Sequence, residues 1–98
     1  MSGEFSFEST LYEWDGPQTW VFAGLPEDLS DVIQEVHGDH AAGFGSLRVE
    51  VVLGGQVWRT SIFPDSKSGT YVLPVKKDVR RKAGVEPGDL VEIDLSVL

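Results

Sequence analysis

The chain has 98 residues, a net charge of −8 and no cysteine, which excludes both a disulfide framework and a thiolate metal site. Hydrophobic residues make up 41% of it, enough for a single domain over residues 1–98 and too many for an intrinsically disordered chain. No apolar run approaches the roughly 20 residues of a membrane-spanning helix, and the first residues lack a secretory signal. We therefore expect a cytoplasmic protein without membrane contact.

Alternating apolar residues predict the first strand over residues 5–11, because every second side chain of a half-buried strand faces the core. Asp15-Gly16-Pro17 predicts a turn, since Gly and Pro together favour one. Residues 20–22 then predict a second strand, which we expect to return antiparallel to the first.

A helix is predicted after Leu25-Pro26, where four apolar residues share one helical face: Leu29, Val32, Ile33 and Val36. Asp28 is the expected N-cap, because a side-chain oxygen there accepts a hydrogen bond from the first turn. Gly38 is the expected residue after the last turn. Residues 39–46 show no periodicity and predict a loop.

The clearest element is a hairpin around Gly54-Gly55, a two-residue turn signal. A turn at that point predicts the facing pairs on the apolar side and on the polar side of the hairpin. On the apolar side they are Leu47 with Ile62, Val49 with Thr60 and Val51 with Trp58; on the polar side they are Arg48 with Ser61 and Glu50 with Arg59. One face is apolar and the other carries opposite charges, as cross-strand pairing prefers.

The remaining predicted elements are a polar loop (64–69), a strand (71–73), a short helix (75–83) closed by Gly84, a tight turn (87–89) and a last strand (91–97). Six strands and two short helices predict a mainly β fold. We expect a small barrel, because closing the sheet removes exposed strand edges. The order strand, Leu-Pro, helix, Gly, strand occurs twice, which suggests a faint internal repeat.

The stretch from Tyr71 to Ile93, YVLPVKKDVRRKAGVEPGDLVEI, resembles the swapped-hairpin element of AbrB/MazE/MraZ-like proteins. With Gly43-Phe44-Gly45 and residues 58–64, nearly the whole chain resembles a small bacterial family known only as a domain of unknown function. Some members are fused to a domain of the bacteriocin-protection (YdeI/OmpD-associated) type. The resemblance implies a double-split β-barrel and no established activity. AbrB-like proteins build this barrel from two chains; because this chain holds two candidate elements, we expect a monomer that closes the barrel alone.

The polar face of the hairpin and the loops beside it form the first candidate site, because loops on a rigid scaffold often carry ligand sites. We interpret the chain as a non-catalytic module that binds a protein or a small ligand through residues 47–63 and the adjoining loops, without a cofactor. The proposed ligand-binding residues are Phe44, Arg48, Arg59, Ser61 and Lys67. The alternative interpretation of this face is a solvated ladder of charges.

Five cations within seven residues form the second candidate site: Lys76, Lys77, Arg80, Arg81 and Lys82. They suggest an AbrB-like regulator that binds nucleic acid, because a basic patch attracts phosphates. The net charge of −8 and the acidic residues of the first helix argue against it. Without such a ligand, the cations form a solvated helix face.

A metal-dependent enzyme at His37, Asp39 and His40 is the minor alternative. Gly38 interrupts the helix between the two histidines, and the chain contains none of the common catalytic motifs. We therefore expect no metal site and no enzyme. Of the three tryptophans, Trp58 is expected in the core and Trp14 at the surface, while Trp20 fits either position.

Overall fold

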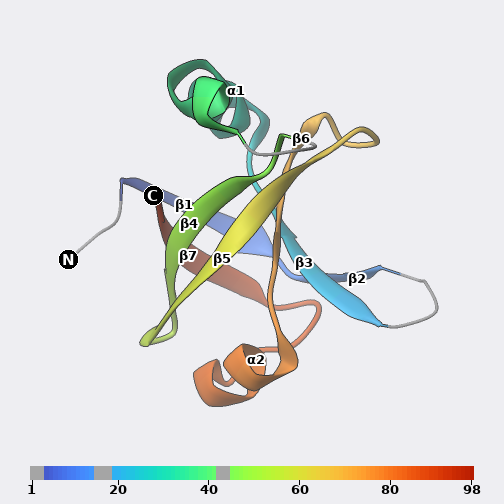
Figure 1. Cartoon of the computed structure of the whole chain (residues 1–98). Coiled ribbons are helices and arrows are strands. Elements are labelled where there is room, and N and C mark those ends of the chain that lie inside the picture. Colours follow the sequence, from blue (N-terminus) through green and yellow to red (C-terminus); the bar gives the residue numbers. More distant parts are fainter. Residues whose placement is uncertain (1–3, 15–18, 42–44) are drawn as a thin grey trace.

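The computed structural model describes residues 4–14, 19–41 and 45–98. Its strands form one curled antiparallel sheet in the order β1-β7-β4-β5-β6-β3-β2, with the two α-helices at opposite ends of the molecule (Figure 1). The strands are β1 (Phe5–Thr10), β2 (Tyr12–Trp14), β3 (Trp20–Gly24), β4 (Leu47–Leu53), β5 (Gln56–Asp65), β6 (Thr70–Pro74) and β7 (Leu90–Val97). The helices are α1 (Glu27–His37), the short 3-10 helix η1 (Gly38–His40) and α2 (Lys77–Ala83). The predicted mainly β fold with two α-helices is confirmed.

The two edge strands of the sheet, β1 and β2, are consecutive in the chain and are separated only by Leu11. The Leu11 amide donates to the carbonyl of Asp89 at 3.0 Å, and the Gly88 amide donates to the carbonyl of Leu11 at 2.8 Å. Leu11 therefore pairs with the turn before β7 and separates β1 from β2. Because β2 is a strand that was not predicted, the described chain has seven strands where about six were expected.

The predicted pairing of the first two strands was wrong. β3 pairs with β2, whereas β1 pairs with β7. β1 pairs with β7 along its whole length, and after Leu11 residues 12–14 form a separate strand, β2, which pairs with β3. The Ser9 hydroxyl still donates to the carbonyl of Gly24 at 2.8 Å, which ties β1 to the end of β3.

The hairpin formed by β4 and β5 has the predicted register in all five pairs. Gly54 and Gly55 have φ angles of +56° and +80°, the left-handed conformation that a tight hairpin turn requires. The side chains on the inner face fill the curl of the sheet, where Val49, Val51 and Ile62 are fully buried. Burying each aliphatic side chain of this size contributes roughly 1.5–3 kcal/mol.

Helix α1 differs from its prediction at both ends. Its N-cap is Pro26, and the Asp28 carboxylate instead accepts a hydrogen bond from the Leu29 amide at 2.9 Å. Gly38 has a helical φ of −57° because the chain continues into η1.

The buried face of α1 also differs from the predicted one. The helix buries Ser30 and Ile33, while Val32 and Val36 are exposed. The face is rotated because the Ser30 hydroxyl accepts a hydrogen bond from the Tyr71 amide at 3.1 Å, which draws Ser30 inward.

The C-terminal half follows its prediction with two shifts. The loop predicted from residue 64 starts at Ser66, because β5 runs on to Asp65 and Pro64 pairs with Tyr71 of β6. Helix α2 begins at Lys77, with Val75 buried ahead of it, and ends as predicted at Gly84 with a φ of +72°. The turn predicted at 15–17 lies outside the described residues. No helix in the described part of the chain has the length and apolar character to cross a membrane.

Candidate functional site

An open groove lies where β5 and β6 separate. The two strands pair only between residues 63–65 and 70–72, and residues 56–62 of β5 pair with β4. The groove has a volume of about 720 Å³, within the range of roughly 300–1,000 Å³ typical of small-molecule sites. Its lining comes from β3, β4, β5, the end of β6 and α2: Thr19, Trp20, Val21, Arg48, Thr60, Ser61, Phe63, Pro74, Val75, Lys76, Lys77 and Arg80.

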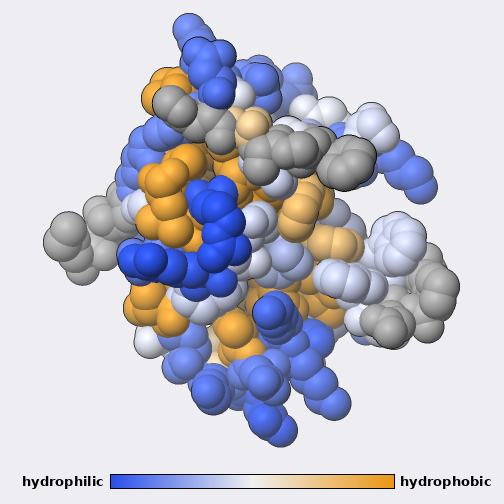
Figure 2. All heavy atoms as spheres, in the orientation of Figure 1, coloured by the Kyte–Doolittle hydropathy of each residue, from blue (hydrophilic) through white to orange (hydrophobic). Residues whose placement is uncertain are grey.

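Four cationic side chains line this groove: Arg48, Lys76, Lys77 and Arg80. None of the lining residues is acidic, and none of the four cations has an ion-pair partner among the residues that the structure describes. Figure 2 shows hydrophobic residues at the surface just above α2, with hydrophilic residues of the helix below them. The groove therefore combines an apolar floor with an uncompensated positive charge.

The Arg80 side chain carries a donor that has no acceptor. Its Nε is buried and makes no hydrogen bond in the described structure. Leaving such a buried donor unsatisfied costs about 1–3 kcal/mol. Arg80 also lines the groove, where its guanidinium group adds to the positive charge.

The groove brings together parts of both predicted sites. Arg48 and Ser61 come from the hairpin set, and Lys76, Lys77 and Arg80 come from the basic set. These two sets were predicted to serve alternative ligands, but the separation of β5 from β6 places them on one surface.

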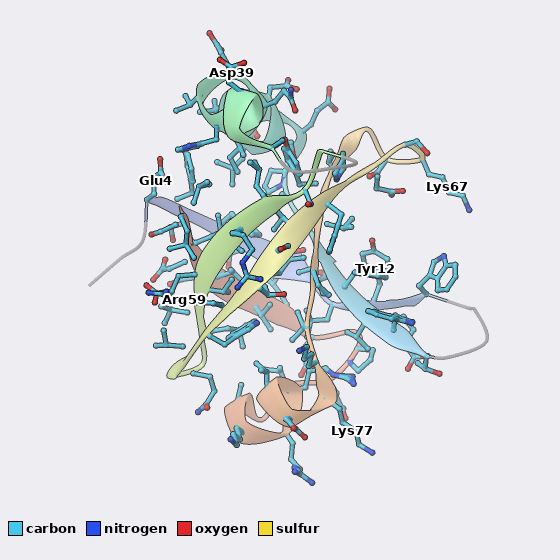
Figure 3. All side chains as sticks on the ribbon, in the orientation of Figure 1. Glu4, Tyr12, Asp39, Arg59, Lys67 and Lys77 are labelled. Carbon is cyan, nitrogen blue, oxygen red and sulfur yellow. The ribbon has the colours of Figure 1, made fainter. Side chains whose placement is uncertain are left out.

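Two members of the hairpin set lie elsewhere. Arg59 is exposed on the outer face of β5, and its Nε lies 3.5 Å from Glu50 Oε1, so the predicted facing pair forms an ion pair. Lys67 lies in the turn between β5 and β6, where it points away from the protein at the opposite end from Lys77 (Figure 3). Phe44 lies outside the described residues.

Two members of the basic set also lie outside the groove. Arg81 Nη2 is 3.6 Å from Asp78 Oδ1 on the exposed side of α2. Lys82 is exposed and is not part of the groove lining. Arg59, Arg81 and Lys82 therefore serve as matched controls, because they are cations of the same elements that do not line the groove.

A second hollow of about 370 Å³ adjoins the groove, and Trp20, Phe63 and Pro74 line both. We name its aromatic wall the aromatic shelf, which consists of Tyr12, Trp14, Trp20, Phe22 and Phe63. The exposed fractions of Tyr12, Trp14, Trp20 and Phe63 are 40%, 46%, 48% and 42%. Such a cluster of exposed aromatic side chains on a small domain marks an interaction site.

The shelf is held in place by ring contacts along the β2–β3 pair. Trp20 stacks on Phe22 with ring centroids 6.1 Å apart and an angle of 9°, and Phe22 contacts Tyr12 at 6.0 Å. Trp14 and Trp20 are opposite each other in the strand register. Partial burial and the nearby negative charge of Asp65 raise the pKa of Tyr12 above its ordinary value, so its hydroxyl stays protonated at neutral pH.

The sequence prediction missed most of the shelf. Trp14 was expected at the surface and is exposed, whereas Tyr12, Phe22 and Phe63 were not proposed. One signal was available: Val21, Ala23 and Leu25 are inward, so the period of two places Trp20 and Phe22 outward. Trp58 is half-buried and packs against the core, as predicted.

Among the side chains that the structure describes, no group of three or more His, Asp or Glu residues could hold a metal ion. His37 Nε2 lies 2.7 Å from Glu4 Oε2, so the N-terminal segment and the end of α1 are in contact. The side chain of His40 lies outside the description.

A comparison with known protein families matches most of the chain. The family described as "Domain of unknown function (DUF1905)" matches residues 7–95, which include every lining residue of the groove and the shelf. The chain belongs to this family. A comparison with curated proteins gives no match.

Proposed function

We propose that this member of the DUF1905 family is a non-catalytic binding module and that its groove binds a small anionic ligand, such as a compound with phosphate groups. The observation that carries the proposal is the convergence of Arg48, Lys76, Lys77 and Arg80 on a groove without any acidic lining residue. The like charges of these four side chains repel one another, and a bound anion would offset that repulsion.

The arrangement of charge in the molecule supports an anionic ligand. The acidic residues of α1, which include Glu27, Asp28 and Asp31, lie at the opposite end of the molecule from α2 (Figure 1). Exposed charges separated by more than about 10 Å are largely screened at ordinary salt concentrations. Asp78 of α2 is paired with Arg81 and does not line the groove, so an anion there would meet the four cations, which can donate charge-assisted hydrogen bonds to it.

The test is a titration of isotope-labelled protein with inorganic tripolyphosphate, followed by amide NMR. We expect shifts at the groove residues and a loss of affinity of about tenfold in Arg48→Ala and in Lys77→Ala, because each removes one charge-assisted contact worth about 1.5 kcal/mol or more. Arg59→Ala and Lys82→Ala should leave the affinity unchanged. Absence of shifts at low salt, or equal losses in the control variants, would refute the proposal.

A nucleic-acid-binding regulator of the AbrB type is the second candidate. It is favoured by the exposed cations that extend the patch along α2 beyond the groove, Arg81 and Lys82. Duplex DNA would contact this whole helix face, so Lys82→Ala should weaken its binding as much as Lys77→Ala does. Affinity for the duplex should also fall steeply as the salt concentration rises. If Lys77→Ala and Lys82→Ala bind tripolyphosphate equally well, the groove proposal is contradicted. If the two variants bind DNA with unequal affinity, the regulator proposal is contradicted.

We also propose that a single chain suffices for this fold. The two edge strands of the sheet are β1 and β2, and only Leu11 separates them in the chain. The chain itself therefore joins the two edges of the sheet, and no second chain is needed to bring them together. The molar mass in solution, measured by light scattering, should be that of one 98-residue chain. An obligate dimer would contradict this expectation.

A further inference from the structure

We infer that the ligand of the groove is a nucleotide, with its phosphates on the cations and its base stacked on the aromatic shelf at Trp20. This inference rests on the proposed anion site and adds the chemical class of the ligand. Its basis is the junction between the two hollows, where Trp20, Phe63 and Pro74 line both the cationic groove and the shelf. A molecule that fills the junction must carry negative charge at one end and a flat apolar group at the other.

The aromatic side of the junction suits a planar ring. Trp20 is 48% exposed, yet its orientation is fixed because it stacks on Phe22 at an angle of 9°. Exposed aromatic faces that are held in place bind nucleobases by stacking, and the gain does not depend on hydrogen bonds to the base edge. Phe63, the shelf residue on β5, provides a second aromatic surface in the junction.

The cationic side of the junction suits more than one phosphate. Four cations line it: Arg48, Lys76, Lys77 and Arg80. A single phosphate has three free oxygens, whereas a chain of phosphates offers enough acceptors for side chains from both β4 and α2. A nucleoside di- or triphosphate and a short stretch of single-stranded nucleic acid share this chemistry, and the experiment separates them.

Duplex nucleic acid does not fit this junction, because paired bases are stacked inside the helix and cannot lie against Trp20. An acidic peptide can place an aromatic ring beside its carboxylates, but each carboxylate carries a single charge and two oxygens. A nucleotide with a chain of phosphates brings more charge and more acceptors to the four cations, and it is therefore the ligand class that we infer.

The experiment is a titration of the intact chain at low salt with four matched probes: ATP, tripolyphosphate, adenosine and the single strand dA12. Binding is followed by tryptophan fluorescence and by the three indole N–H signals in NMR. We expect ATP to bind at least tenfold more tightly than tripolyphosphate or adenosine. The signals of Trp20 and Trp14 should move, while that of Trp58, which lines neither hollow, should not.

Two variants separate the two halves of the ligand. Trp20→Leu should reduce the affinity for ATP about tenfold, to that of tripolyphosphate, and should lower the affinity for tripolyphosphate much less. Arg48→Ala should weaken both, and Arg59→Ala should weaken neither. If Trp20→Leu does not fold, the indole shifts of the unmodified chain still decide the question.

The outcomes are distinct. If ATP binds at least tenfold more tightly than tripolyphosphate and the indole signals of the shelf shift, the ligand is a free nucleotide. If dA12 binds more tightly still than ATP, the nucleotide belongs to a single strand of nucleic acid. Tripolyphosphate binding as tightly as ATP overturns the nucleotide inference and leaves the proposed anion site intact. If no probe binds, both proposals fail together.

Discussion

The two ends of the molecule are built on a similar plan and have opposite character. At each end a strand, a proline at or just after the end of that strand, a helix and a glycine follow one another: β3, Pro26 and α1 at one end, and β6 with Pro74 and α2 at the other. Helix α1 is acidic and sends Ser30 and Ile33 into the core. Helix α2 is basic, has no buried residue and lines the groove.

The attachments of the two helices explain the difference. The Ser30 hydroxyl accepts a hydrogen bond from the amide of Tyr71, and the Tyr71 hydroxyl donates to Gln34 Oε1 at 2.8 Å, so α1 is bonded to β6 at two points. Helix α2 packs through the half-buried Val79 and Ala83. We therefore expect changes in α1 to act on stability and changes in the first turns of α2 to act on binding.

The largest effect is expected for Ile33→Ala in α1. Ile33 is fully buried, and deletion of its side chain leaves a cavity, which costs about 2–5 kcal/mol of unfolding free energy. Val36→Ala is the control on the same helix, because Val36 is 57% exposed and the change should stay within about 0.5 kcal/mol. Urea unfolding measures both. Similar losses in the two variants would show that α1 does not anchor the fold.

The next effect is expected at the hairpin tip, which supports α2. A Cβ atom added at Gly54 would lie 2.9 Å from Ala83 Cβ, so Gly54→Ala adds an overpacking cost of about 1–3 kcal/mol to a left-handed backbone cost of about 1–2 kcal/mol. Gly55→Ala has the same backbone cost but meets no atom within 4 Å.

The difference between these two variants isolates the contact of the hairpin with α2. Urea unfolding should find Gly54→Ala the less stable of the pair, and tripolyphosphate should bind it more weakly because α2 is displaced. Equal stability and equal affinity of the two would mean that the helix does not depend on this contact.

A smaller loss of stability is expected for Ser30→Ala. The variant removes the acceptor of the Tyr71 amide and leaves a buried donor unsatisfied, which costs about 1–3 kcal/mol. Ser66→Ala, at an exposed turn position, is the control. Hydrogen exchange of the Tyr71 amide should accelerate only in Ser30→Ala, while tripolyphosphate affinity stays unchanged in both. If Ser30→Ala also lowers the affinity for tripolyphosphate, the α1 end affects binding as well as stability, which contradicts the contrast between the two ends.

How far the sequence predicts this molecule depends on whether the information is local. The register of the β4–β5 hairpin follows from Gly54-Gly55, because the turn and the period of two determine every facing pair. The inward face of α1 could not be read from apolar spacing, since the bond from the Tyr71 amide turns the polar Ser30 toward the core. That bond joins residues 41 positions apart in the chain.

The candidate site shows the same limit. The sequence identified the four groove cations but assigned them to two candidate sites, because their meeting on one surface depends on the separation of β5 from β6, which long-range pairing determines. The aromatic shelf was hidden because β3 carries apolar residues on both faces, so hydrophobicity alone does not distinguish inside from outside.

The smallest change in stability is expected for Arg80→Met, and its sign opposes that of Ser30→Ala. Methionine keeps a long apolar stem and removes the buried Nε that has no acceptor, and replacing an unsatisfied donor with an apolar group is neutral or stabilising. Unfolding free energy should therefore stay constant or rise by up to about 1 kcal/mol, while tripolyphosphate affinity falls. Arg81→Met, which removes an exposed cation outside the groove, should change neither by more than a small amount.

A stability gain combined with a loss of affinity is the mark of a residue retained for binding. If Arg80→Met instead lowers the unfolding free energy by more than about 1 kcal/mol, other contacts of the Arg80 side chain stabilise the fold. Helix α2 would then contribute to stability as α1 does. If stability and affinity both remain at their original values, the unsatisfied donor has no part in anion binding, and the cationic groove must act through its other three side chains.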